Sequence, residues 1–324
     1  MTGLRPCDES TRDDVYDVVS DRFSSHDCRL IDRYLANPLR RFEPSIGDVA
    51  YEGGRAVGFQ AAILRQLYQD GVPLRGVVGG MLGMKPEASP VLLMQLMKAT
   101  IAPRGGSVLF YANTANPQSS KMNKLLGVKG TGPLSCAAIR FAFTAFPRCL
   151  SFILPKPTSR RLSRDDLRQV DDFWRRYLSF CHGLVSSRSA EELDWVFGDR
   201  LDSGQCVLLG EFDGGALSGY IMIGQTHHGQ RWLVLDWIAI KDERSVLSRL
   251  MASAVRFVRR ETRAILLESI GFPEKAQPIL AHALPFVRKA PSNSFIWKFT
   301  DGRKTGIPEG SWFFGPYDGD RCMG

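Results

Sequence analysis

The sequence contains no apolar run near the length of about 20 residues that a transmembrane helix needs. Its N-terminal residues, MTGLRPCDESTRDD, turn polar and acidic at once, whereas a signal peptide begins with basic and then apolar residues. These absences predict a protein that neither spans a membrane nor carries a classical secretion signal. We therefore expect a cytoplasmic protein.

Patterns typical of metal sites and disulfides are absent as well. The seven cysteines are scattered, odd in number and never spaced as C-x-x-C, which argues against a zinc site or a disulfide framework. His227 and His228 are adjacent, but no third ligand accompanies them, and a solvated turn is the simpler interpretation. No Cys-His or Ser-His-Asp arrangement supports covalent catalysis. The sequence predicts free thiols and no metal.

What the sequence does contain is typical of a globular protein, with 44% hydrophobic and 23% charged residues over 324 residues. That length is enough for two domains, each with its own core. A net charge of +8 favours acidic partners, and a phosphate-bearing small molecule or a nucleic acid would both qualify. Arginine clusters at 160–161 and 256–263 fit a solvated face, with phosphate or RNA binding as the alternative.

The segment Ser107–Gly127 holds the clearest succession of elements. An apolar and aromatic run predicts a strand that ends before Asn113. Pro117 suits the first turn of a helix, because its missing N–H would be unpaired there, and Gly127 suits the C-cap. The polar turn between strand and helix offers amides and free N–H groups at a positively polarised helix start, where an anionic or amide-rich ligand can bind.

An internal repeat relates the two halves of the chain. Each half has helical segments, a two-strand hairpin that turns at Gly-Gly, a further strand, a helix and another strand. A repeat of this length indicates two copies of one mixed α/β unit and not a solenoid. The corresponding residues are Glu52-Gly53-Gly54 with Asp213-Gly214-Gly215, and Lys85, Glu87 and Ser89 with Lys241, Glu243 and Ser245.

We expect the two copies at residues 1–148 and 160–299, joined by a linker at 149–159 that is rich in proline and basic residues. A tail follows at residues 300–324. This tail is too hydrophobic to be a free end and is expected to dock on the body. Its aromatic residues are Trp312, Phe313, Phe314 and Tyr317.

The segment Ser107–Gly127 resembles the strand-to-helix segment of the GNAT superfamily, the acyl-CoA N-acyltransferases. The family pattern is an Asn, a small residue three positions later and a Gly-apolar pair further on, and here Asn116, Ser119 and Gly127-Val128 take those places. The order of elements in both halves is also similar to that of the family. The resemblance implies an α/β (α+β mixed-sheet) fold of two tandem GNAT-like domains, and transfer of an acyl group from acyl-CoA to an amine by direct attack.

In this family one strand exposes backbone groups to the pantetheine arm of coenzyme A, and the turn before the next helix cradles the pyrophosphate. In the first copy, Gly79, Gly80 and Gly83 leave a bare strand. The turn departs from the family's Arg/Gln-x-x-Gly-x-Gly pattern in both copies, but the first keeps small residues where the second has carboxylates. The first copy is the better site for coenzyme A or acyl-CoA. Its predicted cofactor-binding residues are Leu82, Gly83, Met84, Ala88, Ser89, Val91, Asn113, Asn116 and Ser119.

An ammonium group must lose a proton before it attacks a thioester, so a carboxylate within reach is expected. The resemblance implies Asp236 for this catalytic role, although Asp236 could equally pair with Arg231. Asp318 and Asp320 in the tail are further catalytic candidates, since two carboxylates in a glycine-rich loop can bind a cation or the ammonium of a substrate. The tyrosine that many family members use as an acid is replaced by Asn123.

Two other functions fit the sequence. Fem-like peptidyltransferases use aminoacyl-tRNA on the same doubled fold; the charge of +8 and the altered turn favour this class, and the retained Asn turn disfavours it. Two degenerate lobes could also form a binding or scaffold protein without activity. The expected acceptor is a small-molecule amine or an amino-acid-like compound, with tRNA as the alternative partner.

Overall fold

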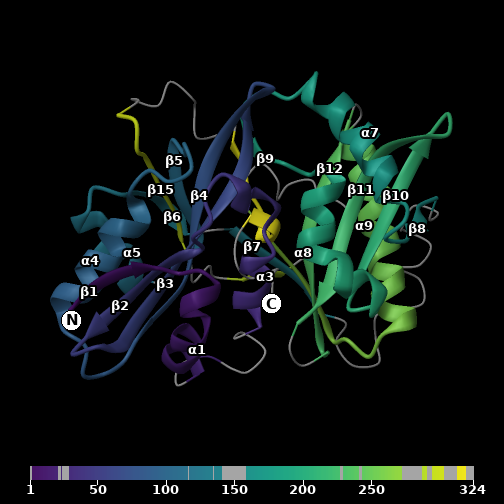
Figure 1. Ribbon diagram of the computed structural model, residues 1–324. Coiled ribbons are helices and arrows are strands. Elements are labelled where there is room, and N and C mark those ends of the chain that lie inside the picture. The colour runs from purple at the N-terminus through teal and green to yellow at the C-terminus, as the bar shows by residue number, and fades with distance from the viewer. Residues whose placement is uncertain are drawn as a thin grey trace. The chain divides into compact units, whose positions relative to one another are not determined.

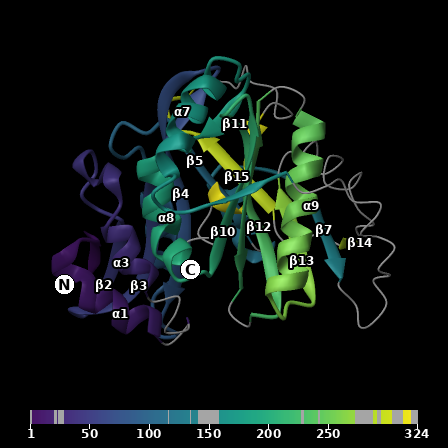
Figure 2. The ribbon, with the colours of Figure 1, turned by 90° about the vertical axis from the view of Figure 1, so that its right-hand side faces the viewer.

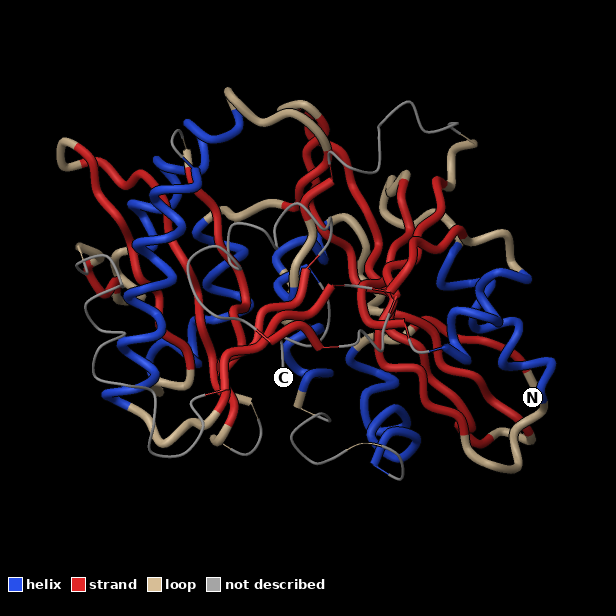
Figure 3. Tube along the Cα trace, turned by 180° about the vertical axis from the view of Figure 1, so that it is seen from behind, coloured by secondary structure: helices blue, strands red, loops and turns tan. Residues whose placement is uncertain are grey.

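The computed structural model describes residues 2–20, 23, 29–115, 117–133, 135–140, 158–226, 229–240, 243–271, 287–289, 294–302 and 312–318. The chain forms two compact units, each built of strands and helices (Figure 1). The first unit comprises Met1–Pro133, Asn293–Ile307 and Asp318–Gly324, and the second comprises Leu134–Ser292 and Pro308–Tyr317. Both contain mixed sheets flanked by helices, which confirms the predicted mixed α/β class (Figure 3).

The strands of the first unit follow the order β1-β2-β3-β4-β5-β15-β6. Helices α1 and α4 both pack against β3 and β4. The elements are β1 (Gly3–Pro6), η1 (Glu9–Thr11), α1 (Arg12–Ser20), α3 (Leu30–Leu35), η2 (Pro38–Arg41), β2 (Gly47–Glu52), β3 (Arg55–Gln69), β4 (Val72–Met84), α4 (Pro90–Ile101), β5 (Leu109–Ala115), α5 (Pro117–Leu125), β6 (Lys129–Pro133) and β15 (Ser294–Phe299).

The strands of the second unit follow the order β14-β7-β13-β12-β11-β10-β8, and β16 pairs in parallel with β9. Helix α9 covers one face of β10–β12, and α7 and α8 cover the other (Figure 2). The elements are β7 (Ser135–Arg140), β8 (Arg160–Leu162), α7 (Leu167–Leu178), β9 (Leu184–Ser186), α8 (Ala190–Asp202), β10 (Cys206–Asp213), β11 (Ala216–Gln225), β12 (Arg231–Ala239), α9 (Glu243–Glu261), β13 (Leu266–Gly271), β14 (Val287–Lys289) and β16 (Trp312–Phe313); η4 (Pro316–Asp318) follows.

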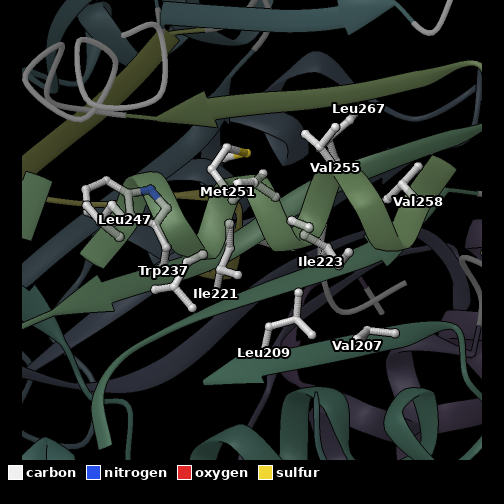
Figure 4. Close-up of a cluster of buried hydrophobic side chains, with 14 of the residues drawn as sticks. Val207, Leu209, Ile221, Ile223, Trp237, Leu247, Met251, Val255, Val258 and Leu267 are labelled. Carbon is white, nitrogen blue, oxygen red and sulfur yellow. The ribbon is translucent and has the colours of Figure 1, made fainter. Parts of the chain in front are cut away.

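The core of the second unit lies between α9 and its sheet. Leu247, Met251, Val255 and Val258 recur at helical spacing along α9 and meet the inward-facing side chains of the strands (Figure 4). The apolar face of α9 covers its sheet, and its polar residues lie on the opposite face. No helix among the described residues is long and apolar enough to cross a membrane.

The two Gly-Gly hairpins predicted from the repeat are both present. Gly53 and Gly54 join β2 to β3 with φ angles of 58° and 84°, and Gly214 and Gly215 join β10 to β11 with φ angles of 56° and 83°. Positive φ at both central residues defines a tight hairpin turn that favours glycine. The two halves of the chain therefore build the same hairpin.

One strand in each sheet comes from a distant part of the sequence. β15 pairs with β5 and β6 of the first unit, and β7 pairs with β13 and β14 of the second. The expected division at residues 149–159 would place β7 with the first copy and β15 with the second. Each sheet is thus completed by a strand from beyond that division.

Candidate functional site

Strands β4 and β5 run parallel over only a short distance. They pair at Gly76–Leu109, Val77–Phe110 and Val78–Tyr111. Beyond Val78, β4 continues against β3 as far as Met84, whereas β5 continues against β15. Among the described residues, no strand pairs with residues 79–84 of β4 on the side that β5 has left. This segment is called here the β4 edge, and its backbone groups on that side form no ladder with a described strand.

The absence of a side chain at Gly79 on the β4 edge lets the ring of Phe110 pack close to the backbone. A Cβ at Gly79 would lie 2.8 Å from a ring carbon of Phe110, so a side chain does not fit there without displacement. The register with β3 shifts between Phe59 and Ala61, and Met81 at this bulge has a φ of 32°. The predicted cofactor residues Leu82, Gly83 and Met84 all lie on the β4 edge.

The predicted pyrophosphate turn lies between β4 and α4. Ser89 is the N-cap of α4, and its hydroxyl accepts a hydrogen bond from the Val91 N–H at 3.2 Å. Ala88 packs beside the small apolar cluster under α4. The Ser89 N–H donates to Oε2 of Glu52 at 3.3 Å, so a carboxylate of the protein itself lies at this helix start.

The structure describes only part of the asparagine-containing turn between β5 and α5. β5 includes Asn113 and extends to Ala115, so the prediction that the strand ends before Asn113 is wrong. The reason is long-range pairing, since Ala115 pairs with Ser294 of β15. Asn116 lies outside the described residues. Ser119 lies in α5, and its backbone and hydroxyl oxygens accept hydrogen bonds from the Asn123 amide at 2.9 and 3.3 Å.

The second unit contains the same parting of parallel strands. β12 and β13 pair from Arg231–Leu266 to Val234–Ser269, and β12 then continues against β11 as far as Ala239. Its register with β11 shifts between Met222 and Ile223, which places a bulge close to the end of the ladder. The segment Leu235–Ala239, called here the β12 edge, corresponds to the β4 edge.

Residues 312–317 cover the β12 edge. Phe313 meets Trp237 edge-on at 4.8 Å between ring centroids, on the face covered by α9. Tyr317 packs on Phe197 of α8 on the opposite face, with ring centroids 5.8 Å apart. Since the tail contacts both faces and β11 occupies the other edge of β12, the tail crosses the edge that β13 has left.

Asp236 lies in a buried network beside this crossing. Both of its oxygens accept hydrogen bonds from Arg188, at 3.0 and 3.2 Å, and Oδ2 also accepts one from the Tyr220 hydroxyl at 2.6 Å. Burial, followed by the charge of Asp236, raises the pKa of Tyr220 well above its ordinary value, so the hydroxyl stays a donor. Arg231, the alternative partner considered from the sequence, pairs with Glu268 instead. This geometry favours a role for Asp236 in positioning Arg188.

Arg188 links the network to the tail. Its guanidinium lies 5.3 Å from the ring centroid of Phe313 and 4.8 Å from that of Tyr317. The Tyr317 hydroxyl donates to the Ser187 carbonyl at 2.7 Å. The sequence did not identify Arg188 as a site residue, because no local pattern around Arg188 predicts an ion pair with a residue on a strand much later in the chain.

Of the two tail carboxylates predicted to be catalytic, the structure describes one. Asp318 is fully buried at the end of η4 and belongs to the first unit, whereas Asp320 lies outside the described residues. Within the described part of the chain, no group of three or more His, Cys, Asp or Glu side chains is placed to hold a metal ion. The catalytic roles of Asp318 and Asp320 stay predictions.

Comparison with known proteins defines the fold class. No family model matches the sequence, and no curated protein matches it. The structure, however, matches solved structures of GCN5-related N-acetyltransferases over most of its length. The chain therefore has the GNAT fold, as the resemblance of its sequence implied.

Three solved structures illustrate the match. A GCN5-related N-acetyltransferase from Kribbella flavida is 13% identical with a TM-score of 0.63, over 93% of this chain and 71% of that one. One from Anabaena variabilis is 11% identical with a TM-score of 0.60, over 93% and 73%. The N-myristoyltransferase of Saccharomyces cerevisiae, solved with myristoyl-CoA, is 12% identical with a TM-score of 0.56, over 91% and 78%. At these identities the likeness concerns the fold.

Proposed function

We propose that this protein is an acyltransferase that moves an acyl group from a pantetheine thioester, such as acyl-CoA, to an amine. The observation that carries the proposal is the β4 edge, where β4 leaves β5 after Val78 and presents Gly79, Gly80 and Gly83. A pantetheine arm is an extended chain with two amides, and it can pair with such an edge as an added strand does. The solved GNAT neighbours, including the one with bound myristoyl-CoA, support this choice of donor.

The donor site is proposed in the first unit. The corresponding β12 edge of the second unit is covered by residues 312–317, whose aromatic side chains pack on Trp237 and Phe197, so it is less accessible to a ligand. Leu82, Gly83 and Met84 would contact the arm of the donor. Asn113, Asn116 and Ser119 would contact the donor close to the thioester, at the start of α5.

Direct attack by the amine is the proposed chemistry. The amine arrives as an ammonium, and a carboxylate takes its proton before the nitrogen attacks the thioester carbonyl. The C–S bond then breaks, and the proton that the attacking nitrogen loses neutralises the leaving thiolate. Asp318 and Asp320 are the proposed proton acceptors or ammonium ligands, since two carboxylates in a glycine-rich segment can bind the ammonium of a substrate. The acceptor is proposed to be a small amine or an amino-acid-like compound.

The proposal is tested by incubating the purified protein with acetyl-CoA or acetyl-pantetheine and a panel of amines and amino acids. Thiol release and the mass of the acetylated product are followed together. Asn116→Ala should weaken donor binding, whereas Leu125→Ala, a truncation of an exposed side chain on α5, should not. Absence of binding and transfer with both thioesters would contradict the proposal, and transfer from aminoacyl-tRNA alone would favour the Fem-like alternative.

A further inference from the structure

The turn that would hold the pyrophosphate of coenzyme A has few N–H groups left to offer. Pro86 and Pro90 have none, because proline lacks a backbone N–H. Anion sites at helix starts depend on several N–H groups that point at the ligand. The paired donors are Ala88 N–H to the Lys85 carbonyl (3.1 Å), Ser89 N–H to Glu52 Oε2 (3.3 Å), Val91 N–H to Ser89 Oγ (3.2 Å) and Leu92 N–H to the Ser89 carbonyl (3.0 Å).

The charges around this turn also oppose a diphosphate. Glu52 places its carboxylate where the positive end of α4 would attract a phosphate, and Glu87 adds a second negative charge from the exposed turn. Lys85, the cation of the turn, is in an ion pair with Asp17 of α1. A diphosphate entering here would meet like charge and would have to displace Glu52 from Ser89.

We propose that Glu52 is a specificity-determining residue that excludes a nucleoside diphosphate from the start of α4. The donor is then recognised by its pantetheine arm alone, and the nucleotide of coenzyme A adds no affinity. This inference rests on the proposed acyl transfer at the β4 edge. It names the donor class as an acyl-pantetheine thioester, supplied either as the free compound or as the arm of an acyl carrier protein.

The sequence of Glu52 and its neighbours explains how the exclusion is built. Glu52 is the last residue of β2, immediately before the Gly53-Gly54 turn, and β2 packs against α4. The apolar cluster of Ala50, Val57, Leu92 and Leu96 fixes α4 on this hairpin. The packing of both elements therefore places Glu52 at the helix start, where its carboxylate accepts the hydrogen bond from the Ser89 N–H.

The test compares the affinities of acetyl-CoA and acetyl-pantetheine for the wild-type protein by ligand-observed NMR competition. We expect the two dissociation constants to agree within about threefold, because a nucleotide without contacts adds little affinity. Glu52→Gln, which keeps the acceptor for the Ser89 N–H, should tighten acetyl-CoA binding about tenfold through loss of one like charge, and should leave acetyl-pantetheine unchanged. Glu52→Ala, which frees that N–H, should act in the same direction.

Glu87→Gln is the matched control, since it removes the same charge from an exposed residue of the same turn and should change acetyl-CoA binding less than Glu52→Gln. The affinity of an acyl carrier protein loaded with an acetyl group is measured in the same way. Tighter binding of this carrier than of acetyl-pantetheine would identify the carrier as the source of the donor. Wild-type binding of acetyl-CoA more than about tenfold tighter than acetyl-pantetheine would overturn the inference and leave the proposed function standing. If neither thioester nor the carrier binds, the proposed function itself fails.

Discussion

Arg188 and Asp236 form an ion pair whose side chains are only 0% and 1% exposed. A buried ion pair is strongly destabilising when one partner is removed, because the other charge is then left uncompensated in a poorly polar environment. Tyr220 adds a third polar group to the same pair. The two charges are therefore energetically coupled, and removing either one alone should lower the free energy of unfolding substantially.

Asp236→Asn and Arg188→Met should each lower the free energy of unfolding by about 3–5 kcal/mol. Replacing both residues with apolar ones should recover part of this loss, since no unpaired charge remains. Urea unfolding of the two single variants and the double variant measures the effect. A stable Asp236→Asn protein that has lost acyl transfer would show instead that Asp236 acts in the chemistry.

Alkaline pH should destabilise the first unit through Cys7 and Tyr51. Burial is the main cause that raises the pKa of the Cys7 thiol from 9.0 to about 12, and burial followed by the hydrogen bond to Asp14 raises the pKa of Tyr51 from 10.0 to about 12. Both groups favour the folded state in their protonated forms. Their contribution is complete below pH 9 and is lost as the pH rises towards 12.

Free energies of unfolding measured at pH values between 8 and 11.5, spaced by about half a pH unit, test this expectation. Cys7→Ala and Tyr51→Phe remove the ionisable groups and should flatten the decline above pH 9. A decline of the same steepness in both variants would mean that other groups cause it.

At the scale of elements, local sequence predicted the turns and helix ends that short-range patterns mark. The hairpins at Gly53-Gly54 and Gly214-Gly215 were predicted and are present, and Gly127 ends the α5 segment with a φ of 72° as a C-cap glycine should. The end of β5 could not be predicted, because Asn113 is a poor strand former and this end of the strand is paired by the distant strand β15. The partner of Asp236 was equally out of reach, since Arg188 lies 48 residues earlier.

The tail segment should stabilise the second unit. Phe313→Ala removes the contact with Trp237 and should lower the free energy of unfolding by about 2–3 kcal/mol, somewhat less than for a fully buried phenylalanine. Tyr317→Phe removes the hydrogen bond to the Ser187 carbonyl and should cost about 1 kcal/mol.

Phe180→Ala is the matched control for these variants, because Phe180 is 59% exposed in the same unit and should change stability little. Urea unfolding followed by circular dichroism measures the stability of each variant. Equal stability of the Phe313→Ala and Phe180→Ala proteins would show that the tail contributes nothing to the unit.

At the scale of the whole molecule, each sheet depends on a strand from the other half of the sequence. β15 lies between β5 and β6, and it carries the buried residues Phe295, Ile296 and Trp297. Without it, two strand edges and an apolar surface would be left uncovered. The repeat in the sequence predicted two similar copies, but it could not show which copy receives β7 and β15, because strand pairing over such distances leaves no local pattern.

A fragment of residues 1–148 should therefore not fold independently. It lacks β15, and we expect it to show no cooperative urea transition and to bind a fluorescent probe of exposed apolar surface. Mixing it with a fragment of residues 149–324 should restore a cooperative transition. A cooperative transition of the first fragment alone, at the urea concentration of the full chain, would contradict the dependence on β15.

The central claim is that a pantetheine thioester binds along the β4 edge of the first unit. Hydrogen exchange of the backbone amides, followed by NMR or mass spectrometry with and without saturating acetyl-pantetheine, tests it most directly. We predict slower exchange within Gly79–Met84 on binding, with no change in the paired segment Gly76–Val78 or in the tail-covered β12 edge, Leu235–Ala239. Unchanged exchange at Gly79–Met84, or protection at Leu235–Ala239 instead, would contradict the claim.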